Sequence, residues 1–122
     1  MRGLFVTFAI LVATLGGSSA FAADQRNVTV VNGTGYGIKF LGFNNPGDNE
    51  WSDNELGGAL ANGGNIYVKF DTSDKGCKWN FKIEWADAGY PGVLWENIDL
   101  CSIDEITLKY DRDTDKTTAV VK

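Results

Sequence analysis

Residues 78–85 (KWNFKIEW) alternate between polar and apolar side chains along their whole length. Successive side chains of a β-strand point to opposite faces, so this period of two predicts a strand with one buried and one solvated face. A sheet containing such a strand needs a second layer to cover its apolar face. The apolar positions are Trp79, Phe81, Ile83 and Trp85, and the polar ones are Lys78, Asn80, Lys82 and Glu84.

Six other segments are short, contain β-branched or aromatic residues and are separated by turn-forming residues. In the second of them, Ile38 and Phe40 are expected to share a face, and Gly42 to mark a bulge. No segment has a sustained 3.6-residue apolar stripe, and residues 53–60 allow one helical turn at most. The fold expected is therefore an all-β, antiparallel β-sandwich of about seven short strands. The six segments are 27–32, 35–43, 65–70, 93–98, 103–110 and 117–122.

The start of the chain has the pattern of a cleavable export signal. A short, positively charged start precedes an apolar run over residues 4–15, and Ala20-Phe21-Ala22 provides a cleavage pattern of small residues. The run is about 12 residues long, whereas a membrane-spanning helix needs roughly 20. We expect residues 1–22 to be a signal peptide and residues 23–122 to be one exported domain, without membrane insertion, in the periplasm or outside the cell.

Cys77 and Cys101 are the only cysteines. In an oxidising compartment they are expected to form a structural disulfide that joins neighbouring strand ends. The other interpretation is a redox-active thiol pair, but the two cysteines lack the C-x-x-C spacing and the chain has no histidine.

The charge balance excludes several classes of function. The chain has 11 Lys and Arg, 16 Asp and Glu, and no His, for a net charge of -5. Nucleic acids and anionic membranes need clustered basic residues, so neither is an expected partner. The absence of His removes catalysis by Ser-His-Asp or Cys-His groups. Two cysteines without histidine do not make a four-ligand zinc site.

An acidic loop at residues 44–55 (NNPGDNEWSDNE) holds four carboxylates and four amides. Ca²⁺ takes six to eight oxygen ligands of these kinds, and a cation would relieve the repulsion between the carboxylates. The alternative is a solvated loop that maintains solubility. No cofactor is required, and the residues that would hold the optional Ca²⁺ are Asp48, Glu50, Asp53 and Glu55.

Residues 111–115 (DRDTD) begin like the calcium loop of an EF-hand. Lys116 and Lys122 occupy the positions at which that loop needs Gly and Glu. A hairpin turn between two strands, with aspartates serving the turn, is the simpler interpretation.

Trp51, Tyr90 and Trp95 are candidates for a ligand-binding surface. Trp51 lies in the acidic loop, Tyr90 begins a Tyr-Pro-Gly turn, and Trp95 follows on a predicted strand. Exposed aromatic rings near Asn and Asp can stack on a sugar or anchor a protein partner. The alternative is that these rings cover a sheet edge or the core.

The stretch NVTVVNGTGYGI at residues 27–38 resembles the start of a family of small exported bacterial proteins. The similarity continues through DNEW at 48–51, Leu56-Gly57, GGNI at 63–66, Cys77 and IDLC at 98–101. It implies an exported β-rich domain of the bacterial envelope. Some members are labelled argininosuccinate lyase, but such a lyase is a large helical enzyme, so we do not extend that activity to this chain.

Together these features favour a small, monomeric, non-catalytic interaction module of the bacterial envelope or medium. Its contact surface is expected in the acidic loop with Trp51, and its ligand is an unidentified protein or carbohydrate. A hydrolase that uses only carboxylates, such as Glu50 and Asp53, is a second hypothesis, because acids and bases other than His remain available. A passive structural or protective envelope protein is a third.

Overall fold

The computed structural model describes residues 24–122. The expected signal peptide, and the first residue of the expected exported domain, lie outside this range. In the described part, seven strands and one short 3-10 helix follow one another, and no helix is long and apolar enough to cross a membrane. The elements are β1 (Val28–Gly33), β2 (Ile38–Asn44), β3 (Asn65–Val68), β4 (Lys78–Trp85), β5 (Val93–Asp99), η2 (Leu100–Ser102), β6 (Glu105–Asp111) and β7 (Lys116–Val121).

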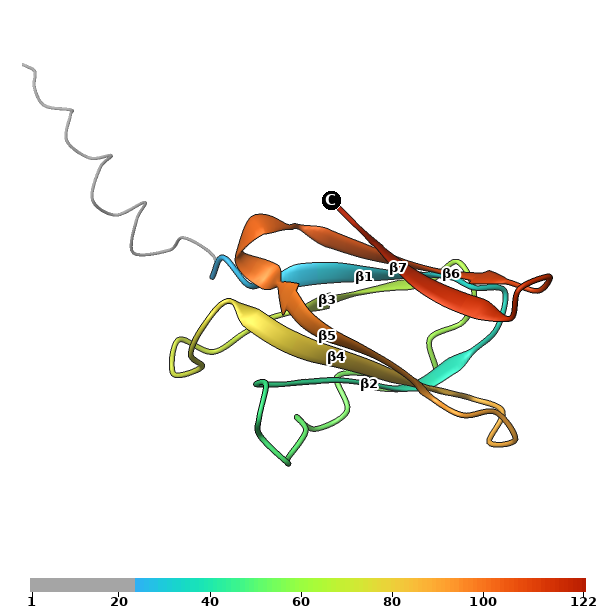
Figure 1. The fold of residues 1–122 in the computed structure, drawn as a ribbon, viewed down its shortest axis with the longest axis horizontal. Coiled ribbons are helices and arrows are strands. Elements are labelled where there is room, and N and C mark those ends of the chain that lie inside the picture. Colours follow the sequence, from blue (N-terminus) through green and yellow to red (C-terminus); the bar gives the residue numbers. More distant parts are fainter. Residues whose placement is uncertain (1–23) are drawn as a thin grey trace, which may run out of the picture.

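The strands form two sheets that face each other across one core (Figure 1). The first sheet has the order β3-β1-β6-β7 and the second has the order β2-β4-β5. The predicted β-sandwich is therefore confirmed. One pairing differs from expectation, because β1 and β6 run parallel, from Thr29 opposite Glu105 to Gly33 opposite Lys109. Among the seven strands of residues 24–122, only β4–β5 and β6–β7 are joined as hairpins, and every other connection crosses between the sheets.

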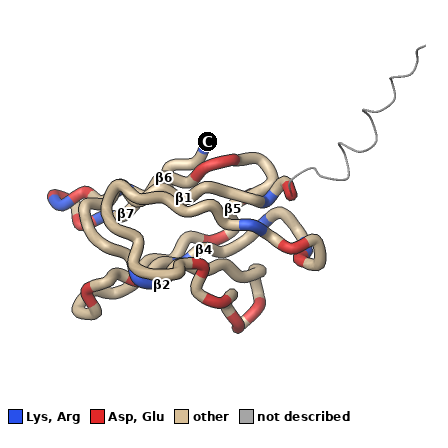
Figure 2. The backbone as a smooth tube through the Cα atoms, turned by 180° about the vertical axis from the view of Figure 1, so that it is seen from behind, with Lys and Arg blue, Asp and Glu red and all other residues tan. Residues whose placement is uncertain are grey.

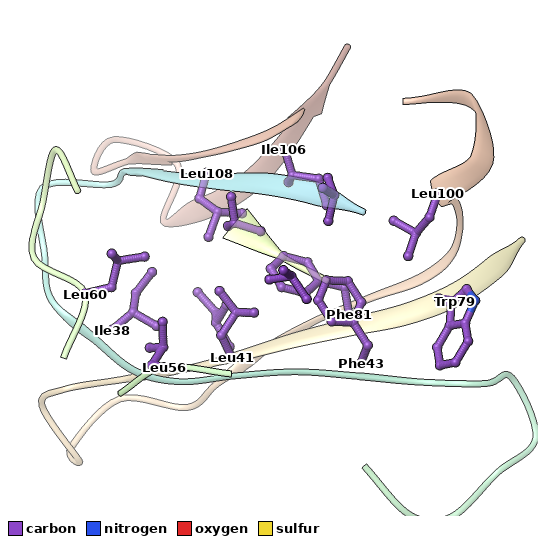
Figure 3. Close-up of a cluster of buried hydrophobic side chains, with 14 residues drawn as sticks. Ile38, Leu41, Phe43, Leu56, Leu60, Trp79, Phe81, Leu100, Ile106 and Leu108 are labelled. Atoms are coloured by element: carbon purple, nitrogen blue, oxygen red, sulfur yellow. The ribbon is translucent and has the colours of Figure 1, made fainter. Parts of the chain in front are cut away.

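The alternating residues of β4 place its apolar side chains toward the core, as predicted. Trp79, Phe81 and Ile83 are buried between the sheets, and Trp85 packs against the edge of the same core. The ring of Phe81 stacks on Phe43 at a centroid distance of 4.9 Å. Figure 3 shows Phe43, Phe81 and Trp79 on one side of the core, with Ile106 and Leu108 of β6 and Leu100 of η2 on the other. Burying each such side chain contributes about 1.5–3 kcal/mol, so this interface is the main source of stability.

β2 departs from the expected alternation. Its register against β4 shifts between Ile38 and Phe40, so Lys39 is an extra residue. Because a shift by one residue reverses the faces, Ile38 is buried while the Phe40 ring lies near Lys82 on the outer face of the sheet. The expectations that Ile38 and Phe40 share a face and that the irregularity lies at Gly42 were wrong. Gly42 instead leaves room for the Phe40 ring, which would lie 2.7 Å from a Cβ at that position.

Residues 53–60 contain no helical turn. They run beside β2 and end in an isolated bridge between Leu60 and Ile38. The sequence allowed one helical turn at most in this segment, because Gly57 and Gly58 disfavour a helix, and the segment instead makes backbone hydrogen bonds to β2.

The disulfide between Cys77 and Cys101 is present, with a Cα–Cα distance of 5.3 Å. Cys77 immediately precedes β4, and Cys101 lies in η2 directly after β5. Since Lys78 pairs with Asp99 in the adjacent ladder, the bond joins two neighbouring strand ends as predicted.

Candidate functional site

Part of the acidic loop covers the outer edge of β2. The amide of Ser52 donates to the Phe43 carbonyl and that of Glu55 donates to the Leu41 carbonyl, both at 2.9 Å. The Asn54 side chain accepts from the Leu41 amide at 3.1 Å and donates to the Lys39 carbonyl at 2.8 Å. An open strand edge invites pairing with other chains, so this segment has a protective structural role that the sequence analysis did not anticipate.

The four predicted calcium ligands have different surroundings. Asp48, Glu50 and Asp53 are exposed, whereas Glu55 is half-buried, and its burial raises the pKa of its carboxyl group. Within residues 24–122, the only three Cys, Asp or Glu side chains whose ligand atoms lie within 4.8 Å of one another are Cys77, Asp99 and Cys101. Two of those atoms are the bonded sulfurs. The structure therefore does not bring three of the predicted ligands to one point, and calcium binding stays a prediction.

Trp51 lies over the outer face of the β2–β4 pair. Its ring centroid is 4.6 Å from the Lys82 ammonium group, which is also 5.3 Å from the Phe40 ring. The ammonium group is thus in contact range of two aromatic rings, an arrangement that is electrostatically favourable. The ring of Trp51 is therefore already in contact with Lys82 of the same chain.

The other two candidate aromatic residues lie elsewhere. The Trp95 ring faces the core and stacks on Phe81 at 5.2 Å with an interplanar angle of 18°. Tyr90 is 65% exposed in the connection between β4 and β5. The three residues predicted as a ligand-binding set are therefore not brought together, and Trp95 belongs to the shell of the core.

An aromatic groove lies beside the β4–β5 and β6–β7 turns. Figure 1 shows both turns at the same end of the sandwich. Its volume is about 500 Å³. Trp85 enters it from the end of β4, Tyr110 from the end of β6, and Tyr36 from the connection between β1 and β2. The three rings meet edge to face, with centroids 5.7–6.4 Å apart. Tyr90 lines the same groove, so one of the predicted aromatic residues is part of it.

Asn32 holds the connection that carries Tyr36. Its buried side chain donates to the carbonyls of Tyr36 and Leu60 at 2.8 and 2.9 Å. Its Oδ1 atom accepts from the Thr34 amide and hydroxyl groups at 3.1 and 2.7 Å. All of its hydrogen-bonding capacity is used, and the crossing between the sheets is fixed beside the groove.

The groove is acidic as well as aromatic. Asp87 and Asp115 line it, and no Lys or Arg of the described part of the chain is among its lining residues. The Tyr110 hydroxyl donates to Asp115 at 2.7 Å, and this bond to a carboxylate raises the pKa of Tyr110. Figure 2 shows acidic positions in the turns at this end of the sandwich, together with basic positions in the β6–β7 hairpin, and further acidic positions in the loop beside β2. The groove therefore combines π-electron surface with negative charge.

Residues 112–115 form the turn between β6 and β7, as the hairpin interpretation of this acidic segment predicted. The Asp113 amide donates to the Asp111 carboxylate at 2.9 Å, and Asp115 has a φ of 53°. A second, more open hollow of about 640 Å³ lies on this hairpin. It mixes Lys109, Arg112 and Lys116 with acidic residues, so it has no single charge character.

Sequence reasoning missed Tyr36, Trp85 and Tyr110 as groove residues. Trp85 was assigned to the core from its place in the β4 alternation, and Tyr110 continues the inward series of Ile106 and Leu108. The signal in the sequence was their position along the strands. Trp85 and Tyr110 are the last inward-facing residues of β4 and β6, where a sandwich opens to solvent.

Comparisons of the chain with known protein families, with curated proteins and with solved structures found no match.

Proposed function

We propose that the protein is a small exported module that acts by binding, without catalysis, and that the aromatic groove is its contact site. The observation that carries the proposal is the meeting of Tyr36, Trp85 and Tyr110 around an open groove of about 500 Å³. Ligand sites are concave, largely preformed and commonly 300–1,000 Å³ in volume. Clustered aromatic residues supply contact area at a low cost in side-chain entropy.

The placement of the groove supports this function. Its walls come from both sheets and from a connection held by the buried Asn32, so the rings are held on a rigid frame. Tyr36 and Tyr90 are nevertheless 50% and 65% exposed, which keeps part of their surface available to a ligand. The sequence placed the contact surface at Trp51, but that ring contacts Lys82 of the same chain. We therefore place the proposed contact surface at the aromatic residues of the groove.

Export is the second part of the proposal. It is supported by the signal-like pattern of residues 1–22 and by the disulfide, which persists in oxidising compartments. Mass spectrometry of the protein recovered from a bacterial host is expected to give an N-terminus at Ala23 in the periplasmic or extracellular fraction. Recovery of the protein in the cytosol with residues 1–22 still attached would contradict export.

Binding at the groove can be tested by nuclear magnetic resonance with a fixed set of probes: chitotriose, maltotriose, choline, arginine amide, and one basic and one acidic tetrapeptide. At least one probe is expected to shift the amides of Gly37, Ala86 and Gly92 saturably. Tyr90→Ala is expected to weaken that binding. Tyr67→Ala, which removes an exposed tyrosine outside the groove, is expected to leave it unchanged. Probes that shift none of these amides at millimolar concentration, or equal effects of the two substitutions, would overturn the assignment.

A further inference from the structure

We propose that the groove selects a small organic cation of the quaternary-ammonium type, an inference that rests on the function proposed above. The groove presents four aromatic side chains, those of Tyr36, Trp85, Tyr90 and Tyr110. The face of an aromatic ring carries negative potential and attracts a cation. Cages of such rings are a recurrent means of binding alkylated ammonium groups.

Charge at the groove favours the same class of ligand. Asp87 and Asp115 line the groove, and no basic side chain is among its lining residues. Arg112 lies in the adjoining turn and faces the second hollow on the hairpin. An anion would therefore meet two carboxylates without a compensating partner in the groove, whereas a cation would meet two opposite charges and aromatic rings.

The hydrogen bonds of these carboxylates favour an alkylated ammonium over a guanidinium group. Asp87 Oδ1 accepts from the Gly89 amide at 3.0 Å, and Asp115 Oδ1 accepts from the Tyr110 hydroxyl at 2.7 Å. Each carboxylate thus has one oxygen that already accepts a bond within the chain, which reduces its capacity for a guanidinium without removing it. A guanidinium is bound best through two parallel bonds to both oxygens of a carboxylate. A quaternary ammonium makes no such bonds, and its methyl groups pack directly on aromatic rings.

The size of the groove also suits this ligand class. A volume of about 500 Å³ accommodates a small molecule with space for water at the open side. The edge-to-face contact between Trp85 and Tyr110, with centroids 6.4 Å apart, joins the two sheets in the lining of the groove. The site therefore exists before the ligand arrives, which reduces the cost of binding.

The test compares choline with 3,3-dimethylbutan-1-ol, a neutral molecule of nearly the same shape in which carbon replaces the charged nitrogen. Both are titrated into the intact, oxidised protein and followed by the amide signals of Gly37, Ala86 and Gly92. Choline is expected to bind at least about tenfold more tightly, since both the rings and the carboxylates act on its charge. Arginine amide is expected to bind more weakly than choline.

Substitutions that change only charge test the roles of the carboxylates. Asp87→Asn and Asp115→Asn keep a side-chain acceptor oxygen and are expected to weaken choline binding roughly two- to fivefold each. Asp113→Asn removes one charge from the same hairpin turn but not from the groove, and is expected to have no effect. Tyr36→Ala is expected to abolish the preference for choline, and Tyr67→Ala, which truncates a tyrosine of equal 50% exposure elsewhere, to preserve it.

The outcomes separate this inference from the proposed function. Equal binding of choline and its neutral analogue, or tighter binding of arginine amide or of a neutral oligosaccharide at the same amides, would overturn the quaternary-ammonium assignment and leave the groove as a binding site. Absence of groove binding by every probe would overturn both. Insensitivity of choline binding to the Asp87 and Asp115 substitutions would also overturn the assignment, since its charge selection depends on them.

Discussion

The hydroxyl group of Tyr110 donates a 2.7 Å hydrogen bond to the carboxylate of Asp115, which stands at the other end of the β6–β7 turn. Both residues line the aromatic groove, and Asp115 adopts a φ of 53° to complete the turn. One residue thus closes the hairpin, orients a groove tyrosine and supplies a negative charge. The hydrogen bond between Tyr110 and Asp115 therefore links the conformation of the β6–β7 turn to the lining of the groove.

Asp115→Asn is expected to lower the pKa of Tyr110 toward the ordinary value of a tyrosine. The bond to Asp115 is the largest cause of the raised pKa, and an amide can accept the bond without opposing ionisation by its charge. Asn also tolerates the left-handed backbone of this turn, so stability should change little. Ultraviolet titration of tyrosinate measures the effect, and Tyr110→Phe identifies the signal. An unchanged titration curve in Asp115→Asn would contradict the coupling.

Loss of the disulfide is expected to reduce stability strongly. Cys77 and Cys101 are 24 residues apart, and closing a loop of this length contributes about 3–3.5 kcal/mol in the chain-entropy account. The double substitution of both cysteines by Ser should therefore lower the thermal midpoint by roughly 12–28 °C. A reductant should lower the midpoint of the wild type and leave the double variant unchanged. A fall below about 5 °C would show that the bond constrains the unfolded chain little.

Asn32→Ala is expected to destabilise the fold by about 1–3 kcal/mol, because a buried group would lose its hydrogen-bond partner. The Asn32 side chain is fully buried and bonds Thr34 and Tyr36 of the β1–β2 connection and Leu60 of the β2–β3 connection. Chemical denaturation measures the loss. The control is Asn62→Ala, which removes one exposed bond to the Gly35 amide. Equal losses in the two variants would contradict a special role for the buried amide.

The strands and the disulfide were predictable because their signals are local. The alternation in β4 marks its own buried face, and the two cysteines had no other partners. The parallel pairing of β1 with β6 was not predictable, because it depends on how four connections cross between the sheets. The bulge at Lys39 was missed for a similar reason, since an extra residue in one strand is defined only against its partner.

The candidate site was less predictable than the fold. Tyr36, Trp85 and Tyr110 come from three separate elements, and no spacing in the sequence links them. The composition of the acidic loop suggested a binding site, yet its residues Ser52 and Asn54 form hydrogen bonds that cover the edge of β2. Composition identifies residues that can bind something, whereas convergence depends on tertiary contacts that a single sequence does not reveal.

Asn54→Ala is expected to loosen the cover over the β2 edge. The substitution removes one acceptor for the Leu41 amide and one donor to the Lys39 carbonyl, at a net cost of about 1–2 kcal/mol. Amide hydrogen exchange at Leu41 should accelerate, and the protein should aggregate at lower concentration because the edge becomes available for pairing. Asn45→Ala, in the same loop, loses only a bond to the Lys75 carbonyl and serves as the control. Unchanged exchange at Leu41 would show that the loop does not protect the edge.

The ion pair between Asp24 and Arg26 is expected to make stability depend on pH at the acidic end. Arg26 Nη2 lies 2.7 Å from Asp24 Oδ2, and Nε lies 2.9 Å from Oδ1. These bonds lower the pKa of Asp24 from 3.8 to about 2. Arg26 also donates to the Asp71 carbonyl at 3.2 Å, so the pair fastens the start of the domain to the β3–β4 connection.

The sign of the effect follows from this lowered pKa. The folded protein binds the Asp24 proton less readily than the unfolded chain, so ionised Asp24 contributes stability above pH 3.8, and the contribution is lost as the pH falls through about 2. Asp24→Asn should therefore be less stable than the wild type at pH 7, and most of the difference should be lost by about pH 2. Thermal midpoints of both proteins between pH 7 and 2, with Asp113→Asn as a control for the loss of one charge, measure it. A difference that persists unchanged at pH 2 would mean that the amide disrupts the local packing rather than the ion pair.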